Sequence, residues 1–338
     1  RVSALSNLLI PAVLFFGLGF LARLIKSDLR FPQDMAKMMS IYLLMAIGLH
    51  GGFELGKSEL GLAFNSVLWA IILGFTLPML GYVLLLFTGK VDLMNAAASA
   101  AHYGSVSAGT FLTAIAYLDN IGVEYESYPL IMLAVMESPA IIVGLLLASW
   151  SRQKIAKASN GGQVVQDRDD RSLKDKIAPL LHEALTNGSV VILIGSMTIG
   201  AISSHKAMEK LFPFIDEIFM GVLCLFLFEM GMEAGRRIKE FKKVGAVLAV
   251  FGLTMPLFGG AAGIIVGHWI LGLSVGGVTL VAVLGASASY IAVPPAMRLA
   301  VPEANPSFYL TLALGITFPF NVVVGIPLYH YVATVVST

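Results

Sequence analysis

Two short segments that interrupt long apolar stretches decide the fold of this chain. The first is Ala101-His102-Tyr103-Gly104-Ser105-Val106-Ser107-Ala108-Gly109-Thr110, and the second is Ser287-Ala288-Ser289-Tyr290-Ile291-Ala292-Val293-Pro294-Pro295. Both are too rich in Gly, Ser or Pro for a comfortable continuous helix. An unpaired backbone group in a bilayer costs several kcal/mol, so a broken helix is tolerated there only where it lines a cavity. Two breaks at matching places in the halves of a chain indicate a transporter's binding site.

The composition is that of a helical membrane protein with several spans. Of 338 residues, 57% are hydrophobic and 13% are charged, whereas soluble domains carry about 25% charged residues. The mean hydropathy is +0.84. The net charge of +1 gives no reason to expect nucleic acid binding, and the single cysteine excludes a disulfide within the chain. We expect the first apolar run to be a retained span and not a cleaved leader.

Apolar windows of about 20 residues predict ten transmembrane helices in two groups of five. The spans lie near 5–25, 34–53, 61–88, 92–118 and 129–150, and then near 187–205, 212–235, 243–271, 275–300 and 307–335. We therefore divide the chain into a first five-helix repeat at 1–150, a linker at 151–186 and a second repeat at 187–338. The linker is either a flexible joint or a docking segment for a soluble partner.

The positions of Lys and Arg predict the orientation of these spans. If the N-terminus lies outside and the spans alternate, 18 of the 22 Lys and Arg residues fall in inside segments. This distribution predicts that both termini are extracytoplasmic and that the linker is cytoplasmic.

The two halves resemble each other in sequence. Residues 45–52 recur at 228–235, 76–79 recur at 254–257, and 137–144 recur at 317–325 with one insertion. Because five is an odd number, the second repeat must enter the membrane upside down. The sequence thus predicts an inverted repeat with broken fourth and ninth helices, and a site near the midplane between the repeats.

The two breaks suit a small anion and its coupling cation. A helix that restarts after Ser107 presents free N–H groups and the positive end of its dipole to an anion. Ser105 and Thr110 add hydroxyl donors, Ser287 and Ser289 supply oxygens, and free carbonyl groups can coordinate Na⁺. The absence of an Arg clamp favours a small, weakly charged anion over a phosphate. The alternative is that these small residues only allow close helix packing.

The fifth span of each repeat places polar groups inside the membrane. Glu137 is expected to bind a cation or a proton, because an intramembrane carboxyl group is expensive and no basic residue is predicted at its depth. The alternative is a neutral, hydrogen-bonded glutamic acid. Thr317 and Asn321 lie near the matching depth, where an amide oxygen suits Na⁺, although Asn residues also bridge helices.

Two other groups receive a structural interpretation. Glu229 and Glu233 are expected to form a solvated or interfacial ion pair with the following Arg236 and Arg237. His102 is expected to be a satisfied interior histidine, because it lacks the setting of a hydrolase. The sequence contains no metal-ligand cluster, phosphate loop or nucleotide fingerprint, so we expect neither an enzyme nor a cofactor.

Five motifs together resemble those of a known family. They read Ala-His-Tyr-Gly-Ser-Val-Ser-Ala at 101–108, Met-Glu-Ser-Pro-Ala-Ile-Ile at 136–142, Ser-Ala-Ser-Tyr-Ile-Ala-Val-Pro at 287–294, Pro-Glu-Ala-Asn-Pro-Ser at 302–307 and Gly-Ile-Thr-Phe-Pro-Phe-Asn at 315–321. The combination is similar to that of the SbtA-type sodium-dependent bicarbonate transporters. It implies Na⁺-coupled bicarbonate import across a bacterial inner membrane, a core domain moving against a gate domain, a homotrimer, and a PII-like regulatory protein on the cytoplasmic face.

The resemblance carries roles to particular residues. Bicarbonate would be held by Gly104, Ser105, Val106, Ser107, Ser289, Tyr290, Ile291 and Ala292. Na⁺ would be held with the help of Thr317 and Asn321, and Ser287, Ser289 and Glu137 offer further oxygens. The residues alone leave three alternatives open: an organic-anion symporter, a sodium/proton antiporter that uses Glu137, and a membrane-embedded hydrolase or receptor.

Overall fold

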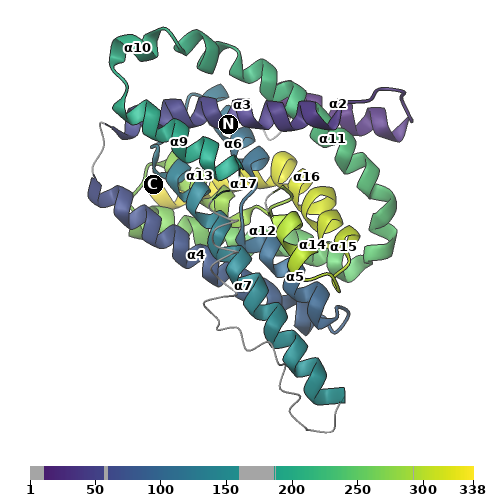
Figure 1. Ribbon diagram of the computed structural model, residues 1–338. Coiled ribbons are helices and arrows are strands. Elements are labelled where there is room, and N and C mark those ends of the chain that lie inside the picture. Colours follow the sequence, from purple (N-terminus) through teal and green to yellow (C-terminus); the bar gives the residue numbers. More distant parts are fainter. Residues whose placement is uncertain (1–10, 57–59, 160–185, 187, 292) are drawn as a thin grey trace.

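The computed structural model describes residues 11–56, 60–159, 186, 188–291 and 293–338, and these residues contain helices but no strand. The first half comprises α2 (Pro11–Leu24), α3 (Gln33–Leu55), α4 (Leu60–Phe87), α5 (Leu93–Gly104), α6 (Ala108–Asn120) and α7 (Tyr128–Ser159). The second half comprises α9 (Gly188–Ile202), α10 (His205–Glu209), η1 (Pro213–Glu217), α11 (Phe219–Val244), α12 (Ala246–Ile265), η2 (Val266–Ile270), α13 (Val275–Ala286), α14 (Val293–Ala300), α15 (Pro306–Leu310), η3 (Thr311–Thr317), α16 (Phe318–Phe320), η4 (Asn321–Gly325) and α17 (Ile326–Ser337). Elements labelled η are π-helical. α7 runs well past the predicted end of its span at 150 and projects from the body of the protein (Figure 1).

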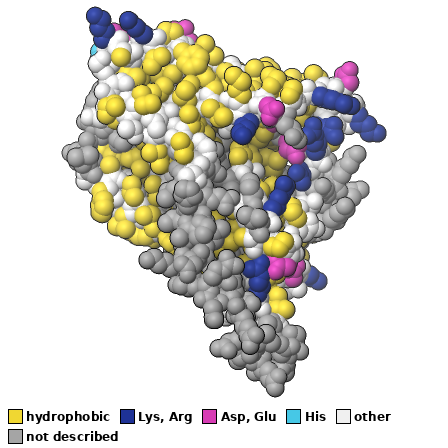
Figure 2. Space-filling model, viewed as in Figure 1, with side chains coloured by type: hydrophobic (Ala, Val, Ile, Leu, Met, Phe, Trp, Pro, Cys, Tyr) yellow, Lys and Arg dark blue, Asp and Glu magenta, His cyan; other side chains and the backbone are white. Residues whose placement is uncertain are grey.

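Five helical stretches of the described chain are long and apolar enough to cross a membrane. They are Asp34–Glu54, Gly61–Phe87, Tyr128–Ile155, Ala246–Ile270 and Pro306–Ser337. Shorter apolar helices lie at Pro11–Leu24, Val191–Ile202 and Val275–Ala286. Large apolar side chains such as Phe64, Phe87 and Phe258 are exposed, and hydrophobic side chains cover much of the face seen in Figure 2. The prediction of an all-helical membrane protein is confirmed.

Both predicted helix breaks are present. α5 ends at Gly104 and α6 begins at Ala108, while α13 ends at Ala286 and α14 begins at Val293. Local chemistry explains both. Ser105 and Ser287 have extended backbones. Proline lacks the N–H group that a continuous helix needs, but it is tolerated in a first helical turn, and the pair at 294–295 lies in the first turn of α14.

Four helices form a layer on one side of the molecule. α2 packs along α11, and α3 packs along α9. In Figure 1, α2, α3, α9 and α11 lie in the upper part of the view, with α4, α5, α7 and α12 below them. We call α2, α3, α9 and α11 the frame helices, and α4 to α7 with α12 to α17 the core helices.

Glycines allow close approach within each frame pair. A Cβ on Gly19 of α2 would meet the backbone oxygen of Phe228, and a Cβ on Gly231 of α11 would meet the backbone oxygen of Phe16. Contact through small residues is typical of helix packing in membranes, where apolar side chains gain little by leaving lipid.

The α3–α9 pair is built in the same reciprocal way. A Cβ on Gly52 would meet the backbone oxygen of Met197, and a Cβ on Gly200 would meet that of Leu49. Each frame pair therefore joins one helix of the first half to one helix of the second half.

The core helices repeat a packing scheme as well. α4 packs against α5 and α7 in the first half, and α12 packs against α13 in the second. Pro78 inside α4 and Pro256 inside α12 occupy corresponding places in the repeated sequence. α13 also packs against α17, as α5 packs against α7. The two broken helices are thereby held in the interior of the core.

Candidate functional site

The two helix breaks are hydrogen-bonded to each other. The amide of Ser107 donates to the Oγ of Ser287 at 3.0 Å, and the amide of Ser289 donates to the backbone oxygen of His102 at 2.8 Å. All four residues are buried. Each break therefore satisfies polar groups of the other, which is the condition for an irregular backbone at membrane depth.

The start of α6 presents amide donors beside this junction. The Oγ of Ser107 caps the helix and accepts hydrogen bonds from the amide of Thr110 at 3.1 Å and from its hydroxyl at 2.9 Å. The amides of Ala108 and Gly109, in the same first turn, have no acceptor within the helix. Together with the positive end of the helix dipole, they form a binding surface for an anion.

The hydroxyl group of Tyr290 lies over the same turn. A Cβ on Gly109 would meet this hydroxyl and would also lie 3.0 Å from the ring of Phe226. The Tyr290 hydroxyl is buried and makes no hydrogen bond of ordinary geometry among the described residues, and the Ser107 side chain is its nearby polar neighbour. Its ring packs edge-on against Phe318, with the centroids 5.3 Å apart. Tyr290 is thus a buried donor held beside the amides of α6.

The other residues assigned to bicarbonate by resemblance occupy different surroundings. A Cβ on Gly104 would meet the ring of Pro78, so this glycine faces α4. The Oγ of Ser105 is buried without a partner among the described residues, and Val106 is buried. Ile291 is 43% exposed. Ala292 lies outside the described residues.

Thr317 already makes hydrogen bonds within the protein. Its hydroxyl donates to the backbone oxygen of Gly252 at 2.7 Å and lies 2.7 Å from the hydroxyl of Tyr103. These two hydrogen bonds connect η3, which contains Thr317, to α5 and α12. Thr317 therefore has a structural role.

Asn321 bridges helices in a similar way. Its Nδ2 donates to the backbone oxygen of Ala286 at 2.9 Å, and its Oδ1 accepts from the hydroxyl of Tyr329 at 3.0 Å. The carbonyl of Ala286 is the last of α13 and has no partner within that helix. Asn321 therefore secures the end of the broken helix, and its oxygen keeps one lone pair for a cation.

The serine oxygens of the second break are also engaged. Ser287 Oγ donates to the backbone oxygen of Leu284 at 3.0 Å in addition to accepting from Ser107, and Ser289 Oγ accepts from the amide of Val293 at 3.4 Å. Glu137 lies in α7, and its side chain is outside the described residues. The structure thus brings Ser287 and Ser289 to the junction and says nothing of the Glu137 carboxyl group.

The interpretation of His102 as a satisfied histidine is wrong for one ring nitrogen. Nδ1 lies 2.6 Å from the backbone oxygen of Ala98, whereas the buried Nε2 has no partner among the described residues. The ring stacks on Tyr309 at 4.4 Å. Because a carbonyl oxygen only accepts, Nδ1 carries a hydrogen.

The prediction for the two acidic residues of α11 is half right. Glu233 pairs with Arg236 at 3.0 Å and with Arg237 at 3.2 Å, as expected. Glu229 takes part in no such pair in the described chain, and its Oε2 is buried without a hydrogen bond. Sequence reasoning missed this difference, although the position of Glu229 one turn farther from the cluster of bases was a signal.

A cavity of about 790 Å³ opens between the frame and the core helices. Its lining includes Ile47, His50, Glu54 and Asp216 on one side and Ile115, Asp119, Gly122, Glu124 and Tyr125 on the other. His50 and Asp216 are 3.3 Å apart. Burial raises the pKa of Asp119, whose carboxylate accepts a 3.1 Å hydrogen bond from Tyr125. In the sequence, the segment 119–128 that borders this cavity contains Asp119, Glu124 and Glu126 and no Lys or Arg.

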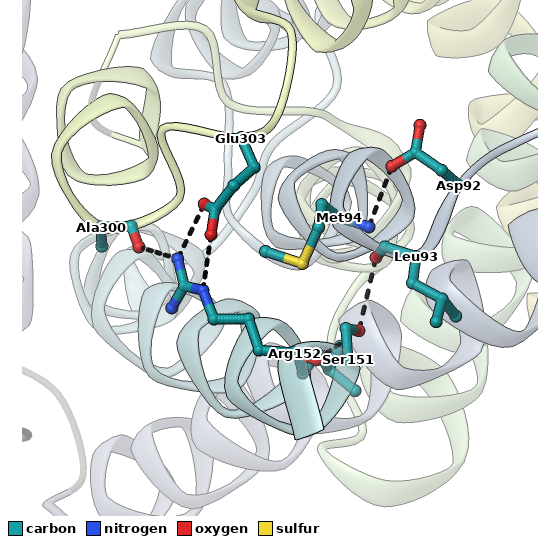
Figure 3. A network of polar contacts seen from close by, with 8 residues as sticks. Asp92, Leu93, Met94, Ser151, Arg152, Ala300 and Glu303 are labelled. Atoms are coloured by element: carbon teal, nitrogen blue, oxygen red, sulfur yellow. Dashed lines mark hydrogen bonds and ion pairs between the residues drawn. The ribbon is translucent and has the colours of Figure 1, made fainter. Parts of the chain in front are cut away.

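The opposite end of the core is held by a polar network (Figure 3). Arg152 of α7 donates to both carboxylate oxygens of Glu303, at 2.8 and 2.9 Å, and to the backbone oxygen of Ala300 at 2.7 Å. The neighbouring Ser151 donates to Leu93 at the start of α5 at 3.4 Å. This network ties α7 to the first segment of one broken helix and to the loop after the other.

A helical membrane protein with two interrupted helices joined in its interior has the architecture of many membrane transporters. The profile of the Na⁺-dependent bicarbonate transporter superfamily matches residues 11–334, nearly the whole chain. The chain belongs to this family, which confirms the resemblance seen in its motifs and identifies Na⁺ and bicarbonate as the family's ions. None of the curated proteins compared with the chain matches it.

Proposed function

We propose that this protein is a sodium-coupled bicarbonate symporter that works by elevator-like alternating access. The observation that carries the proposal is the junction of the two breaks, where the Ser107–Ser287 hydrogen bond places the start of α6 beneath the Tyr290 hydroxyl. Amide and hydroxyl donors without a fixed positive charge suit a small monovalent anion. Among the described residues no Arg or Lys is buried, so release of the anion would leave no buried positive charge without a partner there.

The anion would lie on the amides of Ala108 and Gly109, next to Ser107, with Tyr290 above it. Ser289 and Ile291 would line the second break, and Ser105 would face the end of α5. Carbonyl groups at the ends of α5 and α13 carry the negative ends of their helix dipoles, where a cation is favoured. We place Na⁺ there, near Ser287, Thr317 and Asn321, with Glu137 as a further candidate ligand.

The packing pattern supports an inverted repeat of ten spans. The first predicted span (α2) packs on the seventh (α11), and the sixth (α9) packs on the second (α3). If each span of one repeat is exchanged for its counterpart in the other repeat, the α2–α11 pair becomes the α9–α3 pair. An inverted repeat requires this correspondence. The reciprocal glycine contacts of both pairs follow the same exchange. In this scheme the frame helices would stay in place while the core helices carry the site across the membrane.

The large cavity fits this scheme as an entrance. The cavity reaches Ile115 of α6, which is eight residues, or about 12 Å along the helix, from Ser107. With both termini extracytoplasmic, the cavity would open to the outside. Its acidic residues would attract Na⁺ and steer it toward the site.

We retain three expectations from the resemblance: location in a bacterial inner membrane, a homotrimer, and a PII-like partner at the cytoplasmic face. Residues 160–185 of the linker, one candidate docking segment, lie outside the described residues. Light scattering of the purified protein in detergent tests the trimer. Co-purification with and without adenine nucleotides tests the partner.

The decisive experiment is uptake of labelled bicarbonate into proteoliposomes at fixed pH, with and without an inward Na⁺ gradient. The proposal expects uptake only with Na⁺. Uptake that ignores Na⁺ would refute symport. Absence of bicarbonate uptake by folded protein, together with uptake of organic acids or Na⁺/H⁺ exchange, would favour one of the two alternative transporters.

A further inference from the structure

We infer that Glu229 and Tyr290 form a binding site for a monovalent cation, Na⁺ or a proton, between the frame helix α11 and the broken helix α13–α14. The site is separate from the cation position proposed at Thr317 and Asn321. It does not depend on bicarbonate being the transported anion.

The first observation is the unusual state of Glu229. Glu229 is partly buried. Its Oε2 atom is buried and accepts no hydrogen bond from any described residue. An unpaired carboxylate oxygen in such a place loses its hydration without compensation. Glu233, one turn away, forms ion pairs with both neighbouring arginines, Arg236 and Arg237. A bound cation would compensate the Glu229 oxygen.

The second observation is that the Tyr290 hydroxyl lies in the same region, with the Ser107 side chain nearby and no hydrogen bond of ordinary geometry among the described residues. Gly109 fixes the geometry, because its missing side chain leaves room for both the Tyr290 hydroxyl and the ring of Phe226. Phe226 and Glu229 are three residues apart on α11 and therefore share one face of that helix. Glu229 and Tyr290 are also close enough to interact electrostatically.

The positively charged neighbour of Glu229, Arg236, is already paired with Glu233. Glu233 and Arg236 are the charged neighbours of Glu229 on α11. Other charged or histidine side chains on elements packed against α11 are Arg23 on α2, Asp34, Lys37, His50 and Glu54 on α3, Asp119 on α6, and Asp216 and Glu217 on η1. None of these forms an ion pair with Glu229 in the described chain. η3 and α12, which also pack on α11, contribute no charged side chain among the described residues.

The position of the pair suggests what the cation does. Glu229 belongs to the frame, and Tyr290 belongs to the core next to the anion surface. A carboxylate facing an anion is repulsive unless a cation lies between them. The cation would thus favour the arrangement in which the loaded core faces α11, and it would couple cation binding to the position of the core.

The test compares wild-type protein with Glu229→Gln and Tyr290→Phe, and uses Glu233→Gln as the matched control from the next turn of α11. ²²Na⁺ binding to purified protein is measured without bicarbonate, and the pH profile of uptake is measured at saturating Na⁺. If the cation is Na⁺, Glu229→Gln should weaken Na⁺ binding about tenfold, the equivalent of about 1.4 kcal/mol. Tyr290→Phe should weaken it less, and Glu233→Gln should leave it within about twofold of wild type.

If the cation is a proton, Na⁺ binding should persist and the pH dependence of uptake should flatten in Glu229→Gln alone. Wild-type Na⁺ affinity together with a wild-type pH profile in Glu229→Gln would overturn the inference. If that variant does not fold, Glu229→Asp replaces it, because it keeps the carboxyl group but withdraws it from the site. It should then weaken Na⁺ binding or shift the pH profile of uptake, and wild-type behaviour in both readouts would overturn the inference. A wild-type protein that binds Na⁺ but does not move bicarbonate would count only against the proposed function.

Discussion

The amide of Ser107 and the hydroxyl of Ser287 are joined by a buried 3.0 Å hydrogen bond between the two broken helices. The same hydroxyl donates to the backbone oxygen of Leu284 at 3.0 Å. One side chain therefore ends α13 and holds the start of α6 in place. Few other side chains could do both, because the hydroxyl must donate and accept at once.

Ser287→Ala removes this junction and leaves the Ser107 amide buried without its acceptor. We expect a loss of about 1–3 kcal/mol in unfolding free energy, the usual cost of an unpaired buried polar group. Uptake should fall as well, because the start of α6 is no longer fixed. Thermal unfolding in detergent and uptake into proteoliposomes measure the two effects.

Ser66→Ala is the control for this change. Ser66 is equally buried, but its hydroxyl only bonds the backbone of its own helix, at Leu62. It should unfold and transport much like wild type. A Ser287→Ala protein that resembled this control would mean that the junction does not position the site.

Gly109→Ala should impair transport more than it impairs folding. The added methyl group would meet the hydroxyl of Tyr290 and crowd the amides proposed to bind the anion. We expect weaker bicarbonate binding and a nearly unchanged melting temperature, because the end of a tyrosine can shift. Uptake kinetics over a range of bicarbonate concentrations check this.

Two other glycine-to-alanine variants serve as controls for Gly109→Ala. Gly104→Ala should mainly destabilise the protein, since its methyl group would meet the rigid ring of Pro78. Gly195→Ala should change neither property, because no atom lies within 4 Å of its added carbon. If Gly104→Ala altered bicarbonate affinity and Gly109→Ala did not, the anion would have to be moved toward the end of α5.

The sequence was sufficient to predict the breaks but not the way they meet. Gly, Ser and Pro act locally, so their clusters at 101–110 and 287–295 indicated interrupted helices. The partners of Ser107 and the position of Tyr290 over Gly109 depend on how two distant helices are rotated. Residue spacing carries no information about that rotation.

The misjudged acidic pair has a different cause. Glu229 and Glu233 are four residues apart and look alike as partners for the arginines that follow them. The structure pairs both Arg236 and Arg237 with Glu233, because these lie three and four residues beyond it, whereas they are too far along the helix from Glu229. Closer attention to spacing could have separated the two.

The ion pair between Arg152 and Glu303 should stabilise the core in a pH-dependent way (Figure 3). Hydrogen bonding to Arg152 lowers the pKa of Glu303 below its ordinary value of 4.5. The contribution is therefore fully present above pH 4.5 and is lost as the pH falls through the lowered pKa. Both side chains are more than 40% exposed, so solvent limits it to about 0.2–1 kcal/mol.

Glu303→Gln reveals this contribution when its melting temperature is compared with that of wild type from pH 7 downward. The difference should shrink toward zero at the acidic end, and Arg152→Gln should remove the pH-dependent part as well. A difference that stayed constant over this range would show that Glu303 acts by packing and not by charge.

Thr317→Val and Tyr103→Phe together can separate a structural role of Thr317 from Na⁺ binding. Both changes abolish the 2.7 Å contact between the two hydroxyl groups, but only Thr317→Val removes the oxygen that would face Na⁺ and the hydrogen bond to Gly252. Thr317→Val also leaves the Tyr103 hydroxyl buried and unpaired, at a cost of about 1–3 kcal/mol. If Thr317 is a ligand, the Na⁺ concentration for half-maximal uptake should rise about tenfold in Thr317→Val and stay near wild type in Tyr103→Phe. Equal Na⁺ dependence in both variants, with lower melting temperatures alone, would leave Thr317 as a bridge between α5 and α12.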